Sequence, residues 1–570
     1  MALVAVGGGG GSSSRSVTAV LEESVADVGA LVENWRVDED GGDEPFSIFL
    51  DGGREEAGRF LYAAVELHGA MTLVASDVED VQRRGKCLVR AQEVLEGAMR
   101  RLELELELLL AAVRSNAVDG AIVSGHDVDD AGVVGYIRMV AEAMMAAGYG
   151  MECVSTFKSL RRAEFAGAVR GLLGYAPSQH ARFHKLTWDD VDGKVKSWHT
   201  AAGYAFNVAF TGERILCHSV FAADAAVADK VFEGIASDHA ADLLAVAEAA
   251  VARARRAPER LFHVLDVHAT LAEILPAIVS ALGDKSEATA RATAALRNAG
   301  EAARGILVNF EEAIQKAPSK TATTGGAVHP LTSYVMNYLV LLADYDDTLA
   351  LLYQQGRGTL MITSGSGSNA SPDSPSSSSN LIGRLLSVLM RKLDAMAGRY
   401  RSLALRSLFM ANNTHYVGKK VSGSNKLEGI VGDDWTEAQT AETRRHVDAF
   451  VHAAWRDVLV VGGDGADAAV REAVATQRTW VAADDEMADA LRSAAAAAVV
   501  PAYKALYRRH GAAAWMTPGD VNAMIGRLFG GPSNAAKGGR HVAGGGGSAT
   551  PRRHRLRLTS SSDKLAYEQQ

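Results

Sequence analysis

The sequence predicts an all-α protein, and four observations support this. Apolar residues recur at alternating spacings of three and four over long stretches, which is the period of packed helices. No segment shows the convincing period-two alternation of a β-strand. Prolines number only 12, so long helices can run without interruption. Aromatic residues make up only 6% of the chain, whereas Ala, Leu and Glu are plentiful. Ala, Leu and Glu lose little conformational freedom in a helix.

The bulk composition is that of a globular protein with several subdomains. Hydrophobic residues account for 48% and charged residues for 22%, which is ordinary for a soluble chain. A chain of 570 residues is too long for a single hydrophobic core. The formal net charge of -9 argues against a nucleic-acid partner, so contact with any anionic surface requires a local basic patch.

No targeting or redox feature stands out. The apolar run at residues 1–6 is too short for a signal-peptide core, and no stretch approaches the roughly 18 apolar residues that span a bilayer. Cys87, Cys153 and Cys217 form no C-x-x-C pair, and we expect them to be reduced, packed side chains. The sequence therefore predicts a cytoplasmic protein.

The N-terminal region begins with a Gly-rich segment, residues 1–16, which we expect to be disordered. Residues 17–150 are predicted to form a helical, coiled-coil region. It opens with an amphipathic stretch that carries Leu21, Val25, Val28 and Val32, followed by an acidic loop at residues 38–44.

Two seams of heptad spacing then follow within residues 60–113. The first seam comprises Phe60, Ala64, Leu67, Met71, Val74, Val78 and Val81, and the second comprises Leu88, Leu95, Met99, Leu102, Leu106, Leu109 and Val113. Charge and a glycine, Gly85, separate them. The spacing alone leaves open whether the two seams form one long helix or a hairpin that turns at Gly85.

Residues 151–355 are predicted to form central helical bundles, because helical patterns cover residues 188–221, 240–257, 261–282, 288–316 and 331–353. We expect Pro276 to bend or start a helix rather than lie within one. Asp189 and Asp190 follow Thr187 as they do at a helix N-terminus. The last of these segments, residues 331–353, is strongly apolar and predicts one buried helix.

A linker rich in Ser, Gly and Pro is predicted at residues 356–380, and C-terminal helical bundles at residues 381–530. Heptad spacing resumes there at Ile382, Leu386, Leu389, Leu393, Met396, Tyr400 and Leu403. Further helices are predicted over residues 447–458, 468–478, 486–510 and 519–529. The tail, residues 531–570, is Gly-rich and basic, and we expect it to be disordered.

No pattern points to catalysis, so we expect the protein not to be an enzyme. The sequence contains no G-x-S-x-G elbow, Walker A loop, H-E-x-x-H pair or G-x-G-x-x-G turn between a strand and a helix. Its histidines and cysteines show no metal-ligand spacing. Acid pairs such as Asp346–Asp347 and Asp433–Asp434 suit solvated or backbone-bonded roles. We predict no catalytic residue, cofactor or metal.

Basic side chains near the C-terminus are the candidate functional residues. Lys504, Arg508 and Arg509 lie on a predicted helix, where Lys504 and Arg508 share a face. Clustered Lys and Arg attract anionic lipid, so these three residues are the predicted lipid-binding site. The basic tail is a lesser candidate, as is Lys419–Lys420, which we place in a loop.

Several ordered blocks resemble the seventy-kilodalton subunit family of the exocyst, especially its plant members. The first runs from Leu186 through Trp188 to a Gly212–Phe221 segment that carries Glu213, Arg214 and Cys217. The second is G-G-A-V-H-P-L-T at residues 325–332, followed by Y-V-M-N-Y at residues 334–338. The third is N-N-T-H-Y-V at residues 412–417 with G-D-D-W at residues 432–435. The fourth combines residues 491–493, 500–504 and 527–529.

The resemblance implies a fold and a function. The fold would be an elongated rod of consecutive helical bundles whose N-terminal coiled coil engages other exocyst subunits. The function would be to tether secretory vesicles to the plasma membrane during exocytosis, with the protein peripheral at the inner face of that membrane. The implied partners are phosphatidylinositol bisphosphate and a Rho-type small GTPase. The lipid-binding role maps, by position, onto Lys504, Arg508 and Arg509.

Physical interpretation of these blocks favours packing. We expect His329 to be a hydrogen-bonding structural residue, and Asn412, Asn413 and His415 to cap a helix end. One departure concerns lipid contact: A-A-A-W-M at residues 512–516 precedes Thr517 where the family has lysines. This favours an alternative function, a stand-alone helical adaptor that acts in plant immunity or specialised trafficking outside the core exocyst.

Overall fold

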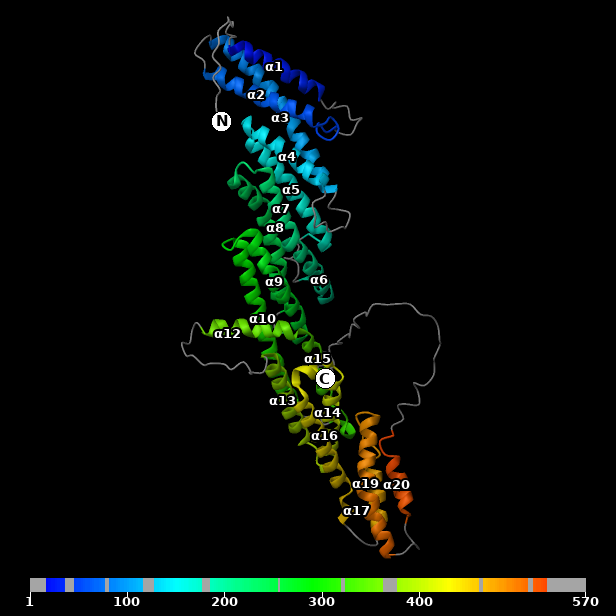
Figure 1. Cartoon of the computed structure of the whole chain (residues 1–570). Helices are drawn as coiled ribbons and strands as arrows, with labels where there is room; N and C mark the ends of the chain where they lie inside the picture. The colour runs from blue at the N-terminus through cyan, green and yellow to red at the C-terminus, as the bar shows by residue number, and fades with distance from the viewer. Residues whose placement is uncertain are drawn as a thin grey trace, which may run out of the picture. The chain divides into compact units, whose positions relative to one another are not determined.

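The computed structural model describes residues 17–35, 46–76, 81–115, 128–176, 185–254, 257–318, 323–361, 377–460, 465–510 and 516–530. Within these ranges the regular structure is helical throughout, without a β-strand, and the all-α prediction is confirmed (Figure 1). The predicted disordered ends, 1–16 and 531–570, lie outside the described residues. So does most of the predicted linker, although helices α12 and α13 extend into its two ends.

The chain divides into two compact units. The first contains residues Met1–Pro318, Tyr334–Lys392 and Val421–Asp433, and the second contains Ser319–Ser333, Leu393–Lys420 and Asp434–Gln570. Each unit therefore combines segments that are far apart in the sequence, and we describe each unit by itself.

The first unit begins with helices α1 (Val17–Asn34), α2 (Arg54–Ser76), α3 (Val81–Ser115) and α4 (Val128–Ala146). Helix α1 packs on both α2 and α3, which also pack on each other (blue in Figure 1). Most described members of the predicted seams are buried in these contacts: Phe60, Leu67, Leu95, Leu102 and Leu109 are each at most 1% exposed. Met71, Leu88 and Val113 are half-buried, and Val78 lies outside the described residues. The two seams thus belong to two helices. Helix α2 ends at Ser76, α3 begins at Val81, and Gly85 lies exposed inside α3.

A buried carboxylate holds the end of the connection between α1 and α2. Glu105 of α3 is 0% exposed and accepts hydrogen bonds from Ser47 Oγ (2.6 Å), Ile48 N (2.9 Å) and Phe49 N (3.1 Å). Arg101 pairs with Glu105 at 3.1 Å and also donates to the carbonyls of Trp35 and Phe46. These two charged side chains therefore anchor both residues that flank segment 36–45.

The middle of the first unit contains α5 (Gly150–Leu173), α6 (Trp188–Tyr204), α7 (Phe210–Val220), α8 (Ala225–Ala254), α9 (Leu261–Leu282) and α10 (Glu287–Lys316). Thr187 caps α6 in a capping box with Asp190, as the sequence predicted. A π-helical turn, η2 (Ala205–Ala209), joins α6 to α7. Trp198 is buried, and its indole N–H donates to Leu243 O at 2.8 Å.

Helix α9 is the most apolar helix of this unit. The sequence was expected to contain no stretch long and apolar enough to cross a membrane, but among the described residues one segment, Pro258–Leu282, meets this test, with half of it buried. In the structure this helix packs against α6, α8 and α10, so a position in the core accounts for its composition. Pro276 lies inside α9, so the expectation that it would not lie within a helix was wrong.

The remaining helices that contribute to the first unit are α11 (Pro330–Leu342), α12 (Asp346–Met361), α13 (Ser377–Ala397) and α15 (Asn425–Val431). The single buried helix predicted over residues 331–353 is interrupted by a 3-10 turn, η5 (Ala343–Tyr345). Tyr345 at this turn donates to Asp266 of α9 at 2.9 Å, and Lys426 of α15 pairs with Asp344 at 3.1 Å.

The second unit contains the end of α13 together with α14 (Leu403–Ser422), α16 (Asp433–Ala454), α17 (Arg456–Val460), α18 (Ala466–Gln477), α19 (Asp485–His510) and α20 (Pro518–Gly526). Phe450, Trp455, Leu491 and Tyr503 are fully buried in its core. The predicted seam continues correctly as far as Met396. Leu403, its last member, is 67% exposed, because α13 ends at Ala397 and the helical register is lost there.

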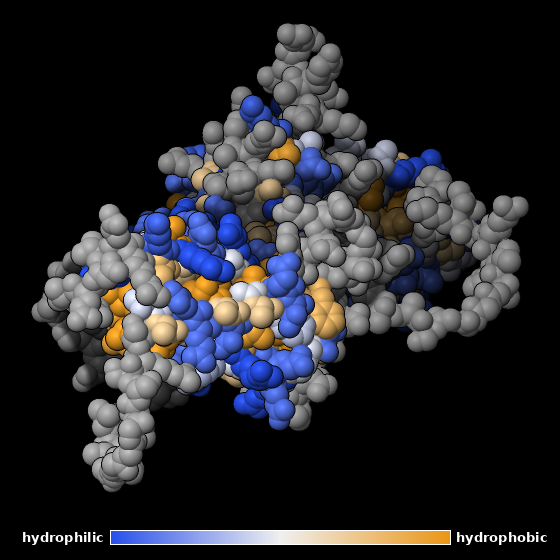
Figure 2. All heavy atoms as spheres, turned by 90° about the horizontal axis from the view of Figure 1, so that it is seen from above, coloured by the Kyte–Doolittle hydropathy of each residue, from blue (hydrophilic) through white to orange (hydrophobic). Residues whose placement is uncertain are grey.

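Exposed apolar side chains of the first unit are scattered. Figure 2 shows hydrophobic areas interspersed with hydrophilic ones over the visible surface of the described residues. Tyr62 and Leu73 of α2, Val89 of α3 and Ile215 of α7 are each more than 60% exposed. Single exposed apolar residues of this kind are common on soluble proteins and do not by themselves indicate a function.

Candidate membrane-contacting site

The predicted lipid-binding residues lie together near the end of helix α19. Lys504, Arg508 and Arg509 are all exposed, and they occupy the last two turns of that helix. Leu491, Val499 and Tyr503 of the same helix are fully buried, so the apolar face of α19 packs into the unit and the basic residues remain outside. Lys504 and Arg508 share a face because they are four residues apart.

The basic end of α19 is held by a polar contact beneath it. Tyr503 donates from its hydroxyl to Asp467 of α18, and the other oxygen of that carboxylate accepts from Met516 N at 3.1 Å. Burial, together with the neighbouring Asp467, raises the pKa of Tyr503. Residue 516 follows segment 511–515, so Asp467 ties α18, α19 and the start of the α20 region to one another.

Charge along α19 is segregated. Asp485 and Glu486 lie in its first turn, whereas the three basic residues lie at its other end. Both placements complement the helix dipole. Among the described residues, no ion pair or hydrogen bond engages the side chains of Lys504, Arg508 or Arg509. Their charge is thus directed to solvent. The basic tail and residues 512–515 lie outside the described range.

The second and third sequence blocks meet in one buried polar cluster of the second unit. Asn412, 0% exposed, donates to Gly326 O (2.7 Å) and Val481 O (2.8 Å) and accepts from Ala483 N (2.8 Å). Asn413, also 0% exposed, accepts from His329 N (3.0 Å) and Thr332 Oγ1 (2.6 Å). The expectation that Asn412, Asn413 and His415 lie at a helix end was wrong, because all three lie inside α14. The two asparagines bind backbone and side chains from distant segments.

The two glycines of this cluster allow a close approach of backbones. Gly325 has a φ of 68° and Gly326 a φ of 74°. A Cβ on Gly325 would lie 2.5 Å from Thr479 O, and Val481 N donates to Gly325 O at 2.9 Å. His329 accepts from Leu331 N through Nδ1, and burial lowers its pKa. As expected, it is a hydrogen-bonding structural residue.

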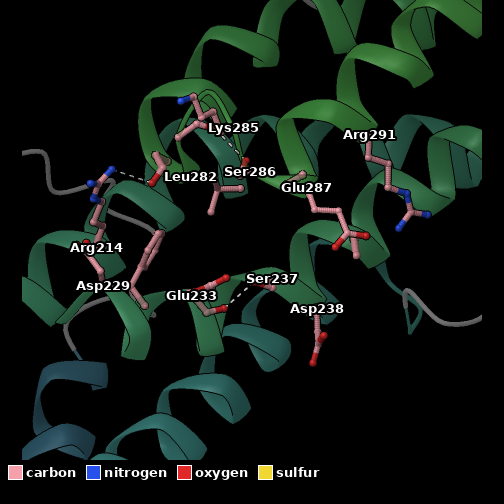
Figure 3. Close-up of a pocket in the computed structure, with 15 residues that line it drawn as sticks. Arg214, Asp229, Glu233, Ser237, Asp238, Leu282, Lys285, Ser286, Glu287 and Arg291 are labelled. Atoms are coloured by element: carbon pink, nitrogen blue, oxygen red, sulfur yellow. Dashed lines mark hydrogen bonds between the residues drawn. The ribbon is translucent and has the colours of Figure 1, made fainter. Parts of the chain in front are cut away.

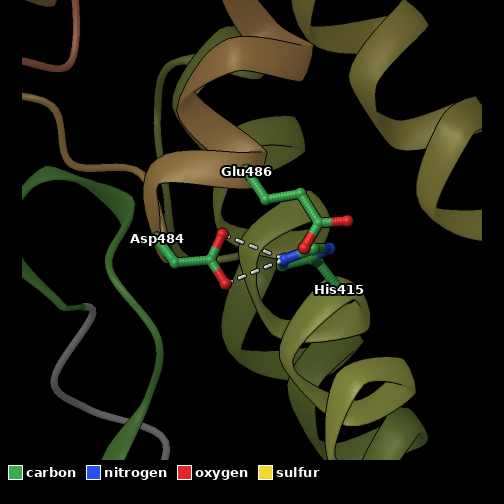
Figure 4. Close-up of side chains that lie close together, drawn as sticks. All are labelled: His415, Asp484 and Glu486. Atoms are coloured by element: carbon green, nitrogen blue, oxygen red, sulfur yellow. Dashed lines mark hydrogen bonds and ion pairs between the residues drawn. The ribbon is translucent and has the colours of Figure 1, made fainter. Parts of the chain in front are cut away.

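A network of charged side chains joins α14 to the start of α19. His415 Nε2 lies 3.1 Å from both carboxylate oxygens of Asp484 (Figure 4). Lys419 donates to Asp484 at 2.6 Å and to Glu486 at 3.3 Å. Although its environment is partly desolvating, Asp484 has its pKa lowered to about 2 by hydrogen bonds from Lys419, Met487 N and His415. No spacing in the sequence indicated this network, because its two halves are more than 60 residues apart.

His415, Asp484 and Glu486 are the described residues whose ligand atoms come close enough to hold a metal ion. Imidazole and carboxylate are suitable ligands for Zn²⁺. The ammonium of Lys419, however, already bridges the two carboxylates and supplies the positive charge that they require. We interpret the group as an ion-pair network that fastens α19 to α14. Lys419, placed in a loop by the sequence, lies in the last turn of α14.

A surface pocket of about 630 Å³ lies between α8 and the α9–α10 turn in the first unit (Figure 3). Most of its charged groups are engaged: Arg214 donates to Ser280 O and Ala281 O, Asp238 pairs with Arg162, and Arg291 pairs with Glu248. Of its two hydroxyl residues, Ser286 caps α10 and Ser237 donates to Glu233 O. The pocket lining contains no histidine or cysteine, and nothing in it pairs a nucleophile with a base.

The described structure is helical throughout and carries exposed charge on its surface. Comparison with known families makes the assignment specific. The family model for the C-terminal part of the Exo70 component of the exocyst complex matches residues 196–461 and 467–526, which is more than half of the chain. The chain belongs to the Exo70 family of exocyst subunits. This confirms the resemblance seen in the sequence and places the chain among non-enzymatic proteins.

Relatives in Arabidopsis thaliana are similar over most of the chain. It is 28% identical to exocyst complex component EXO70C2 over 71% of this chain and 61% of that protein. It is 28% identical to EXO70B1 over 70% of this chain and 67% of that protein. With EXO70A1 it shares 25% identity over 85% of each. The chain thus spans about three fifths of the length of EXO70C2.

Solved structures agree with the fold. The crystal structure of the Saccharomyces cerevisiae exocyst component Exo70p superposes with a TM-score of 0.60 at 12% identity. It covers 90% of this chain and all of the yeast chain. A second structure of yeast Exo70, with additional residues, gives a TM-score of 0.58 over 90% of this chain and 99% of the other. At such low identity these similarities concern the fold alone.

Proposed function

We propose that this chain is an exocyst subunit that tethers secretory vesicles to the plasma membrane during exocytosis. The observation that carries the proposal is the family match, which covers residues 196–461 and 467–526. The protein acts through contacts with other exocyst subunits and through phosphoinositide binding, and it is cytoplasmic, peripheral at the inner face of the plasma membrane. A Rho-type small GTPase is its regulatory partner.

Phosphoinositide binding is assigned to Lys504, Arg508 and Arg509. Their exposure, their common position at the end of α19 and the lack of any described ion pair support this role. Each Lys or Arg near an anionic surface contributes about 1 kcal/mol of binding free energy. Three of them together would strengthen binding by about two orders of magnitude, and added salt would weaken it.

Flotation with phosphatidylcholine vesicles, with and without phosphatidylinositol bisphosphate, tests this site. A variant with Lys504, Arg508 and Arg509 all replaced by alanine should lose about 100-fold in affinity for the phosphoinositide vesicles. A matched control replaces Arg297, Arg444 and Arg478, which are exposed elsewhere, and removes the same charge. It should keep most of the affinity. Equal losses in both variants would assign binding to net charge and refute the site.

Contacts with other exocyst subunits require helix faces that are not already packed against other helices of this chain. The heptad seams of α2 and α3 are buried against α1 and against each other. A partner helix would therefore dock on the outer faces of these helices, where Tyr62 and Leu73 are exposed, or replace α1.

The same burial favours a second function, that of a stand-alone helical adaptor outside the core exocyst. A chain whose seams are satisfied within itself has less need of a permanent partner. The adaptor hypothesis predicts binding to single partners without assembly into the complex. Size-exclusion chromatography of cell extracts distinguishes the two functions, since an adaptor would elute apart from the other exocyst subunits.

A further inference from the structure

The turn between α13 and α14 combines exposed positive charge with an exposed leucine. We define the arginine–leucine loop as Arg399, Arg401 and Leu403, which lie between Ala397, the end of α13, and the first turn of α14. Leu403 is 67% exposed and is the most exposed large hydrophobic residue described in the second unit. Arg399 and Arg401 are also exposed.

The loop is held in place from inside. Tyr400, between the two arginines, bonds through its hydroxyl to Thr323 O at 2.7 Å, and its ring packs on Phe409 with centroids 5.4 Å apart. Backbone hydrogen bonds from Arg399 N and Tyr400 N close the end of α13. Ser402 Oγ accepts from Leu405 N at the start of α14. The exposed side chains are therefore presented by an ordered backbone, and binding would cost little additional ordering.

The charge of the two arginines is uncompensated. Two carboxylates of the second unit's neighbouring segments already form ion pairs with other arginines: Asp394 pairs with Arg406 at 3.3 Å, and Glu442 pairs with Arg445. Asp394 also contributes to the raised pKa of Arg445, after Glu442 as the main cause. No described hydrogen bond or ion pair reaches the side chain of Arg399 or Arg401.

From this geometry we infer that the arginine–leucine loop is a second membrane-contacting element, which docks on an anionic lipid surface and inserts Leu403 among the acyl chains. A lone exposed leucine is ordinary on a protein surface. An exposed leucine preceded by two exposed arginines matches both layers of an anionic bilayer, since the guanidinium groups face the phosphates and the apolar side chain enters the hydrocarbon boundary. A protein partner would have to offer a matching apolar pocket with acidic rims, whereas any anionic bilayer offers both layers. The inference rests on the proposed action at a membrane but not on the α19 site.

The test places a polarity-sensitive fluorophore at the tip of the loop. Leu403→Cys in a Cys87→Ser background carries the label, because Cys153 and Cys217 are buried and Cys87 is the partly exposed thiol. Phosphatidylcholine vesicles that contain phosphatidylserine should shift the emission to the blue, and pure phosphatidylcholine vesicles should not. The same shift should persist when Lys504, Arg508 and Arg509 are replaced by alanine, provided that the vesicle concentration is raised to saturate binding.

Affinity measurements complete the design. Arg399→Gln with Arg401→Gln should weaken binding to phosphatidylserine vesicles about 30-fold, at about fivefold for each charge. Arg297→Gln with Arg456→Gln, two exposed arginines elsewhere, should change it by less than about threefold. Leu403→Ser should weaken binding several-fold, while Ile215→Ser, at a similarly exposed position, should not.

The possible outcomes separate this inference from the proposed function. If the labelled protein floats with anionic vesicles but its emission does not shift, the loop stays in water and the inference is refuted, while membrane binding by α19 stands. If a soluble acidic peptide shifts the emission and vesicles do not, the loop is a protein-docking site and the membrane assignment is wrong. If the protein binds no anionic vesicle at all, both the inference and the proposed lipid binding fail.

Discussion

At the residue level, one buried carboxylate organises the connection between α1 and α2. Glu105 accepts from three donors of residues 47–49 and pairs with Arg101, whose own pKa is lowered mainly by burial. A buried ion pair contributes little net free energy, but removing one partner leaves the other charge and its donors without compensation in a dry environment. Glu105 is therefore a position where a small change should have a large local effect.

We expect Glu105→Ala to destabilise this part of the first unit by about 3 to 5 kcal/mol. Because Ile48 N and Phe49 N donate to Glu105 directly, their amide hydrogen exchange should accelerate by more than about 100-fold. Exchange measured by mass spectrometry over residues 46–61 checks this. Glu107→Ala, at an exposed position of the same helix, is the control and should leave the exchange unchanged. Unaltered protection in the Glu105 variant would mean that the carboxylate is dispensable.

The sequence could not have revealed this residue. Glu105 lies within a run of alternating Glu and Leu, and by pattern it belongs to a solvated helix face. Its hydrogen-bond donors at residues 47–49 are more than 50 residues away, and local periodicity carries no information on such contacts. The same holds for Asn412 and Asn413, which looked like capping residues. Their amides bind segments from residues 326–332 and 481–483, which only the tertiary fold brings to α14.

At the level of elements, the second unit depends on the close approach of residues 325–326 and 479–481. Gly325 adopts a positive φ and leaves no room for a Cβ beside Thr479 O. Val481 N, which donates to Gly325 O, and Asn412, which binds Gly326 O and Val481 O, complete the junction. Three segments are thus joined by backbone groups, which any side chain at residue 325 would separate.

Gly325→Ala should destabilise the second unit by about 2 to 3 kcal/mol, because it combines an unfavourable backbone conformation with a steric clash at Thr479 O. Urea unfolding followed through Trp480 and Trp455 fluorescence measures the effect. Gly418→Ala serves as the control: it lies in helix α14, where a Cβ would meet Gln439 Cγ at an ordinary 3.6 Å. Alanine there should be neutral or stabilising by up to about 1 kcal/mol. Equal behaviour of both variants would contradict the tight junction.

The spacing of apolar residues predicted which segments are helical, but it predicted the residues at which the helices end less well. The seams of α2, α3 and α13 are buried as their spacing predicted, because burial of an apolar stripe determines helix packing. Helix α2 ends at Ser76 and α3 begins at Val81, so Gly85 lies inside α3, where a glycine on an exposed helical face costs only about 1 kcal/mol. Leu403 fitted the heptad spacing in sequence but follows a helix end. That misassignment concealed the arginine–leucine loop, for which the run R-Y-R-S-L was the available signal.

At the level of the whole molecule, the described residues form a buried apolar interior and an exposed surface rich in charge. The all-α class, the family and the non-enzymatic nature followed from periodicity and from ordered motif blocks, and the comparisons confirm them. The predicted subdomain boundaries, the lipid-binding residues and the GTPase partner remain predictions. The last two concern binding partners, and the sequence of a single chain does not determine which partner covers a given surface.

Assembly with the remaining exocyst subunits is the property to measure first. The full-length chain should be expressed with an affinity tag beside the other subunits, and co-purification should be quantified against EXO70A1 of Arabidopsis thaliana, similar over 85% of this chain, under the same conditions. We predict recovery of the subunits in constant proportion to the tagged chain, at a level comparable to that relative. Recovery of the complex with EXO70A1 but not with this chain would contradict the proposed role and leave a helical adaptor in its place.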